Sequence, residues 1–439
     1  MIVFAARIAM IVTMPADIEF SFRQLTRSAQ RHVRVFQIHQ FLDRFAMGLT
    51  VAVVALALID RGMDLFQISL LFGVYSVTTM ATELPFGGLA DTIGRKPVFL
   101  SAVVASVISL GLFLSSNDFL VLALSFAFIG FGRALRSGTL DAWFVENFRV
   151  LAPNVDIQPA LAKAQWANAM GLAFGAICGG LLPDVFGDVA IRFGFSIFDV
   201  SYAASLIMMI VLFVFTFVAI TEEPRPLNLK ALGHGFTRVP SVVGEAGLLA
   251  LKHPTLSILL FALALFLMAT NPVEVFWPTY ARGLLNDSYA NTAIGVLTAA
   301  YFFSIAFGAA LSPHINRLFK RQNAITLSVA FACLAALQIA LAFQGAMIGF
   351  VVMFVLFSVV LGSTETPASS ILHSCVENHQ RSTMLSLRSL VQQLGAAVGL
   401  MAFGGIAEGY TLPVAWMGGA GFLMIAVLLT GMLAKRLRR

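Results

Sequence analysis

Charged side chains interrupt several of the long apolar segments of this chain. A charge inside a membrane-spanning segment is costly, and such residues usually belong to a pathway for ions or solutes. With a rise of about 1.5 Å per helical residue, Arg133 falls near the middle of its segment, while Asp43, Glu83 and Arg136 fall at similar depths nearer one end. We therefore expect a proton-coupling group or solute cavity built from these side chains: Asp43, Arg44, Glu83, Arg133, Arg136, Glu274 and Glu365.

A carboxylate beside an arginine can couple a proton to a conformational change. Loss of water disfavours the charged carboxylate, a nearby cation favours it, and a movement that separates the two groups alters the balance. Asp43 and Glu83 are the carboxylates for which we expect transport-linked protonation. The alternative is a static ion-pair network that only holds the helices together.

The composition requires most of the chain to face something other than water. Of its 439 residues, 59% are hydrophobic and 11% are charged, whereas soluble domains carry roughly 25% charged residues. A spanning helix needs about 20 apolar residues, and the apolar segments predict an all-α polytopic membrane protein with 12 transmembrane helices in two six-helix bundles. The expected spans are 36–59, 66–90, 97–116, 119–146, 160–183, 195–220, 255–282, 291–313, 323–343, 347–374, 383–407 and 412–433.

This pattern divides the chain into five parts. A basic amphipathic segment at 1–35, expected to lie on the cytoplasmic membrane surface, precedes an N-terminal bundle at 36–220. A polar cytoplasmic linker at 221–254 leads to a C-terminal bundle at 255–433 and a basic tail at 434–439. For the first dozen residues, a true start at Met10 or Met14 is an equal alternative.

Lysine and arginine are concentrated in one of the two sets of loops, those that would lie on one side of the membrane. They crowd the N-terminal segment, the linker, the tail and every second loop, whereas the other loops hold only Arg61, Arg192 and Arg282. By the positive-inside rule, this asymmetry predicts that both termini are cytoplasmic. We expect a multi-pass protein of the bacterial inner (plasma) membrane.

The sequence ELPFGGLADTIGRK, residues 83–96, forms a short elbow between the second and third spans. It resembles the loop between helices two and three of the major facilitator superfamily, whose pattern is G-x-L-A-D-x-x-G-R-K/R. The resemblance implies alternating access by two rocking bundles, with Asp91 and Arg95 in a gating contact. The acidic partner of Arg95 is either Asp141 or Glu146. The implied gating residues are Gly88, Asp91, Gly94, Arg95, Lys96, Asp141 and Glu146.

Two further motifs match the family in part. The fifth span carries Gly171, Gly175, Gly179 and Gly180, which resemble the antiporter signature G-x-x-x-G-P-x-x-G-G of exporters, with Ala176 in place of the proline. Glycines at this spacing also serve ordinary close helix packing. The fourth span departs from the common R-x-x-x-G form, so either Arg133 or Arg136 could fill the family's helix-four role.

Other chemistries find little support. The three cysteines have no disulfide or metal spacing, and we expect no metal, no cofactor, no enzyme activity and no nucleic-acid partner. The expected partners are a small-molecule substrate, protons and the lipid bilayer, and the expected state is a monomer. We expect proton-coupled efflux of a small organic or amphipathic solute. The alternatives are a proton-coupled uptake symporter or facilitator of a metabolite, a non-transporting sensor or scaffold, and a membrane enzyme using His373, Glu377 and His379.

Overall fold

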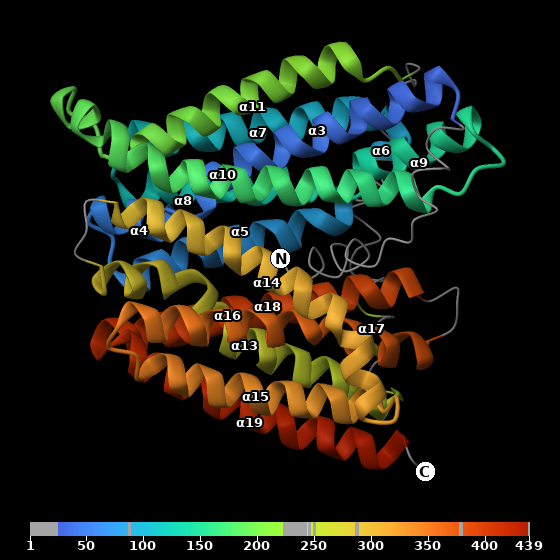
Figure 1. Cartoon of the computed structure of the whole chain (residues 1–439), viewed down its shortest axis with the longest axis vertical. Helices are drawn as coiled ribbons and strands as arrows, with labels where there is room; N and C mark the ends of the chain where they lie inside the picture. Colours follow the sequence, from blue (N-terminus) through green and yellow to red (C-terminus); the bar gives the residue numbers. More distant parts are fainter. Residues whose placement is uncertain are drawn as a thin grey trace.

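A computed structural model describes the chain over residues 25–86, 89–222, 244, 247–248, 252–285, 289–376 and 381–437. Within these residues every regular element is a helix. Helices of one sequence half gather on one side of the molecule and those of the other half on the opposite side (Figure 1).

The helices of the N-terminal half are α3 (Arg27–Val51), α4 (Val54–Asp60), α5 (Leu65–Phe86), α6 (Leu89–Ile93), α7 (Arg95–Ser115), α8 (Phe119–Arg136), α9 (Thr139–Leu151), α10 (Gln158–Arg192) and α11 (Asp199–Ala219). Those of the C-terminal half are α13 (Pro254–Gly283), α14 (Ala290–Leu318), α15 (Asn323–Ala342), α16 (Met347–Ser363), α17 (Glu365–Ser374), α18 (Arg381–Gly409) and α19 (Leu412–Leu437).

Eleven helical stretches in the described part are long and apolar enough to cross a membrane, and a bent pair, α3 with α4, makes a twelfth. Each half then contributes six spans, as the hydropathy pattern predicts. Below, spans are numbered from one to twelve along the chain. Counted within its own half, α5 and α14 are each the second span, and α10 and α18 are each the fifth span.

Three of the spans are broken, which hydropathy alone does not predict. The first bends by 41° between α3 and α4. The fourth breaks between α8 and α9 at Gly138, whose φ of 70° lies in the left-handed region that glycine tolerates. The tenth breaks between α16 and α17 at Thr364, the corresponding place in the second half.

The basic N-terminal segment differs in part from its expected form. Arg27, Arg31 and Arg34 lie in α3 and are continuous with the first span, so this portion is no separate surface helix. The N-cap Thr26 accepts a hydrogen bond from the backbone N–H of Ala29, at 3.3 Å, which fixes where this helix begins. Arg23 and the residues before it lie outside the described part.

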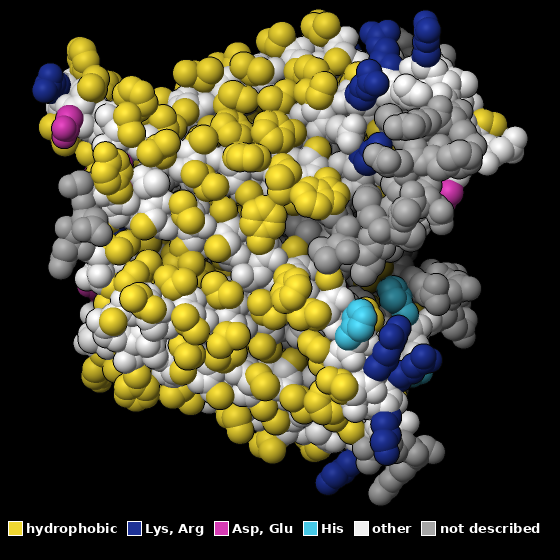
Figure 2. All heavy atoms as spheres, in the orientation of Figure 1, with side chains coloured by type: hydrophobic (Ala, Val, Ile, Leu, Met, Phe, Trp, Pro, Cys, Tyr) yellow, Lys and Arg dark blue, Asp and Glu magenta, His cyan; other side chains and the backbone are white. Residues whose placement is uncertain are grey.

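The surface matches a protein surrounded by lipid. Hydrophobic side chains cover the middle of the molecule, and Lys and Arg gather at one end (Figure 2). At that end, here named the basic end, lie the start of α3, the start of α7 and the end of α19. The opposite end, here named the acidic end, carries Asp60, Asp64, Asp118 and Glu408 at or next to helix termini, and Asp184 of α10 against the start of α14.

Candidate functional site

A buried ion pair joins the first and fourth spans of the N-terminal half. The Arg136 Nη1 lies 3.0 Å from the Asp43 Oδ1, and both side chains are largely buried. Arg44 approaches the other carboxylate oxygen of Asp43, with its Nε at 3.8 Å. The structure thus brings Asp43, Arg44 and Arg136 together.

Neighbouring groups fix this ion pair. The Arg136 Nη2 donates to the Ser106 Oγ at 3.0 Å, on α7. His39, one turn before Asp43 on α3, is 2% exposed and packs edge-on against Phe99, with ring centroids 4.6 Å apart. Within the described part of the chain, neither His39 ring nitrogen has a hydrogen-bond partner. Sequence reasoning missed His39, although a histidine one turn from Asp43 was the available signal.

Two other charged residues of this half lie apart from the pair. Arg133 is exposed and donates to the Tyr75 hydroxyl at 2.7 Å. Glu83 accepts a hydrogen bond from the Gln393 Nε2, at 3.4 Å, across the boundary between the two halves. Among the described residues, no cation lies within salt-bridge distance of Glu83. The two carboxylates expected at one level therefore have different surroundings.

The C-terminal half also holds a buried ion pair, at the break in the tenth span. The Arg388 Nη2 donates to the Glu365 Oε2 at 2.6 Å. Ser369 bridges the pair, because it accepts from the Arg388 Nη1 at 2.8 Å and donates to the Glu365 Oε1 at 2.7 Å. Sequence reasoning found Glu365 but missed Arg388, which lies in the eleventh span. The other candidate of this half, Glu274, lies beside the Tyr301 hydroxyl of α14.

At the elbow, one of the two possible partners of Arg95 is in contact with it. The Arg95 Nη2 donates to the Glu146 Oε1 at 2.6 Å. Asp141 accepts instead from the Gln40 Nε2 at 3.1 Å, and the Gln40 Oε1 accepts from Asn168 at 3.2 Å. Gly88 and the side chain of Asp91 lie outside the described part, so the expected contact of Asp91 stays a prediction.

The elbow contains an acidic group that the sequence did not reveal. Glu222, three residues beyond α11, accepts from the backbone N–H groups of Arg95 at 2.9 Å and Lys96 at 2.7 Å. These are orphan donors of the first turn of α7, where a carboxylate is also favoured by the helix dipole. Gly94, with φ of 99°, brings the chain into this contact. The sixth span is thereby tied to the elbow.

We expect Glu222→Ala to loosen the elbow. The change removes a charged cap, and the loss is about 0.5–2 kcal/mol of local stability. Hydrogen exchange of the α7 amides by mass spectrometry measures it, with faster exchange over the first turn as the expected result. Asp118→Ala, which removes a carboxylate cap from α8 (Oδ1 to the Leu120 N–H, 2.9 Å), is the control. Unchanged exchange at the start of α7 would contradict the role of Glu222.

The glycines of the fifth span serve two interfaces. A Cβ at Gly171, Gly175 or Gly179 would meet the α3 backbone, each at 2.3 Å from a carbonyl oxygen, so these three allow α10 to pack closely on the first span. A Cβ at Gly180 would lie 2.2 Å from the Asn291 carbonyl oxygen and 2.9 Å from the Gly295 Cα of α14. Gly180 therefore lies at the boundary between the two halves.

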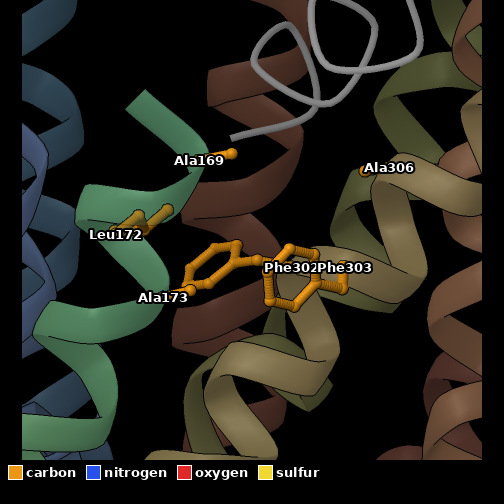
Figure 3. A pocket seen from close by; sticks show the side chains of 6 residues that line it. All are labelled: Ala169, Leu172, Ala173, Phe302, Phe303 and Ala306. Carbon is orange, nitrogen blue, oxygen red and sulfur yellow. The ribbon is translucent and has the colours of Figure 1, made fainter. Parts of the chain in front are cut away.

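This boundary loosens away from the acidic end. Toward the basic end from Gly180, α10 and α14 border a small hollow. Its lining is apolar, and Phe302 points from α14 toward Ala173 of α10 (Figure 3). The two helices are thus in backbone contact near the acidic end, and apolar side chains line the hollow between them farther along.

The family model of the Major Facilitator Superfamily matches residues 38–400 of the chain. The chain belongs to the Major Facilitator Superfamily. Its helical architecture is therefore that of a multi-pass membrane transporter of this superfamily. The alternative of a membrane enzyme loses its support, and of its three candidate residues Glu377 and His379 lie outside the described part.

Relatives and solved structures agree with this assignment. The chain is 22% identical over 383 residues to the inner membrane transport protein YajR of Escherichia coli, covering 71% of this chain and 80% of YajR. It is 28% identical over 228 residues to the multidrug resistance protein MdtG of Salmonella typhimurium, and this match covers 49% of this chain and 48% of MdtG.

Two solved structures of transporters have similar folds. The crystal structure of the nucleoside transporter NupG aligns with a TM-score of 0.73 at 14% identity, covering 92% of this chain and 98% of NupG. A bacterial homologue of the human lysosomal transporter Spinster, in an inward-facing and unoccupied conformation, aligns with a TM-score of 0.69 at 15% identity, covering 93% and 98%. At these identities the likeness concerns the fold.

Proposed function

We propose that this facilitator exports a small organic or amphipathic solute by alternating access, and that protons drive the export. The observation that carries the proton-coupling part is the Asp43 carboxylate, buried inside a bundle between Arg136 and Arg44. Protonation of Asp43 removes the attraction that holds Arg136, and deprotonation restores it. A buried carboxylate–arginine pair can thereby link proton occupancy to the arrangement of the first and fourth spans.

Three features support export over uptake. MdtG, to which about half of this chain is similar, is named as a multidrug resistance protein. The fifth span carries the glycine pattern of the antiporter signature, and three of its glycines lie against α3, the helix that carries Asp43. The boundary between α10 and α14 is lined by alanine, leucine and phenylalanine around the small hollow, so a path that opens there would present an apolar surface to the solute.

The proposed path for the solute lies between the two bundles. Arg133 and Tyr75 supply polar groups from the N-terminal half, and Glu274 with Tyr301 supplies them from the C-terminal half. The positive-inside rule places the basic end in the cytoplasm. We propose an inner-membrane location with both termini cytoplasmic, and a monomer as the working unit.

The decisive experiment compares transport with and without a pH gradient in inverted vesicles. Export coupled to protons predicts solute accumulation inside these vesicles only when their interior is acidic, and its loss when the gradient is collapsed. Counterflow without a gradient should persist, because exchange needs no net proton movement. Uptake by symport predicts the opposite direction of accumulation, and a facilitator predicts equilibration alone. Vesicles without the protein are the control, and a panel of toxic organic compounds identifies the solute.

A further inference from the structure

A carboxylate of one bundle caps a helix of the other bundle at the acidic end. Asp184, on α10, accepts three hydrogen bonds from the first turn of α14. The Asn291 Nδ2 donates to its Oδ1 at 2.8 Å, and the Thr292 N–H and Oγ1 each donate to its Oδ2 at 2.7 Å. Because α14 begins at Ala290, the carboxylate satisfies one orphan backbone donor of the first turn, that of Thr292, and lies at the positive end of the helix dipole.

The second boundary between the bundles repeats this arrangement with the roles exchanged. Glu408, near the end of α18 in the C-terminal half, accepts from the backbone N–H of Leu65 at 3.0 Å. Leu65 is the first residue of α5 in the N-terminal half. Each bundle therefore supplies one carboxylate, from its fifth span, and one capped helix, its second span.

The two bundles pack closely, with a glycine at the contact, beside each cap. Beside Asp184, a Cβ on Gly295 would lie 2.5 Å from the Ala176 carbonyl oxygen of α10. Beside Glu408, a Cβ on Gly404 would lie 1.9 Å from the Ser69 Oγ of α5. Neither cap can form unless the two bundles touch here, so both contacts exist only while the acidic end is closed.

We propose that Asp184 and Glu408 form two reciprocal clamps that hold the acidic end of the transporter closed. When the bundles separate at this end, both carboxylates leave the helix N-termini that they cap. The backbone N–H groups of α14 and α5 then form hydrogen bonds with water instead. The clamps thereby set the ratio of closed to open molecules. The proposal holds for either direction of transport and requires only that the bundles part at this end.

Spin-label distance measurements on the full chain in lipid nanodiscs test the clamps. In a background with Cys178, Cys333 and Cys375 replaced by serine, labels at Phe193→Cys and Ile348→Cys report the separation of the bundles at the acidic end. Both positions are highly exposed, at 75% and 82%, and one lies in each half. Asp184→Ala and Glu408→Ala should each raise the ratio of long to short distances about three- to fivefold. The double variant should raise it about tenfold or more, because the two sites are independent.

The control removes the same kind of cap within one bundle. Asp118 accepts from the Leu120 and Val121 N–H groups of its own helix α8, at 2.9 and 3.3 Å, so Asp118→Ala should leave the distances unchanged. If either alanine variant does not fold, Asp184→Asn and Glu408→Gln remove the charge at nearly constant volume. Folded variants at both positions with wild-type distances would overturn the proposal, as would an equal shift in Asp118→Ala.

Discussion

Asp43→Asn should reduce solute accumulation driven by a pH gradient at least tenfold. Counterflow of the solute should stay within about threefold of wild type. Asparagine keeps the shape of the side chain but does not bind and release a proton at physiological pH. The coupling of protons to transport is therefore lost, while the rocking of the bundles is retained. The measurement is accumulation in inverted vesicles with and without a gradient, beside counterflow in the same preparation.

The same variant should also lower thermal stability. Arg136 would keep its bond to Ser106 but lose its ion pair, and breaking one partner of a buried pair costs roughly 3–5 kcal/mol. Asp43→Asn with Arg136→Gln should recover much of that stability without recovering the coupling. Glu83→Gln tests the second expected carboxylate in the same assay. If Asp43→Asn keeps full gradient-driven accumulation, Asp43 is a structural residue and the proposed coupling site is wrong.

Gly180→Ala should slow transport at least tenfold while each bundle stays folded. Its Cβ would lie 2.2 Å from the Asn291 carbonyl oxygen in the opposite bundle, a contact that only a separation of the bundles can relieve. The closed arrangement of the acidic end then becomes unfavourable, and the transport cycle stalls. Turnover in vesicles and the melting temperature of the purified protein are the two measurements.

Gly175, five residues before Gly180, gives the matched contrast, because it packs inside one bundle. Gly175→Ala would place a Cβ 2.3 Å from the Phe45 carbonyl oxygen and should cost about 1–3 kcal/mol of stability through overpacking. Gly111→Ala on α7 is the neutral control, since a Cβ there meets nothing within 4 Å. Equal turnover in Gly180→Ala and Gly111→Ala would contradict the role of Gly180 at the boundary.

Hydropathy predicts the spans of this protein well because lipid imposes a minimum length on every apolar helix. It predicts the breaks less well. The fourth span reads as one apolar stretch, and only the backbone of Gly138, which adopts a positive φ, divides it. Arg27 likewise reads as part of the basic surface segment at 1–35, whereas the helix that contains it continues into the first span.

Side-chain partners are harder to predict because depth is a property of one helix, whereas contact depends on which faces meet. Counting residues places Asp43 and Arg136 at one depth, and they do form an ion pair. The same count places Glu83 with them, but its helix turns this side chain toward Gln393 of the other bundle. Arg388 and Glu222 escaped notice because neither lies in a recognised motif. The transport roles of all these residues stay predictions.

The breaks in the fourth and tenth spans affect the charges that lie beside them. The end of α8 exposes carbonyl groups next to Arg133 and Arg136, and the start of α9 exposes N–H groups next to Asp141. The start of α17 does the same for Glu365. Partial charges of about half an electron at each helix end favour the ions placed there. The ends of an interrupted helix thus supply fixed partial charges that replace part of the stabilisation by water. Ionisable groups beside such a break can therefore stay charged where water is scarce.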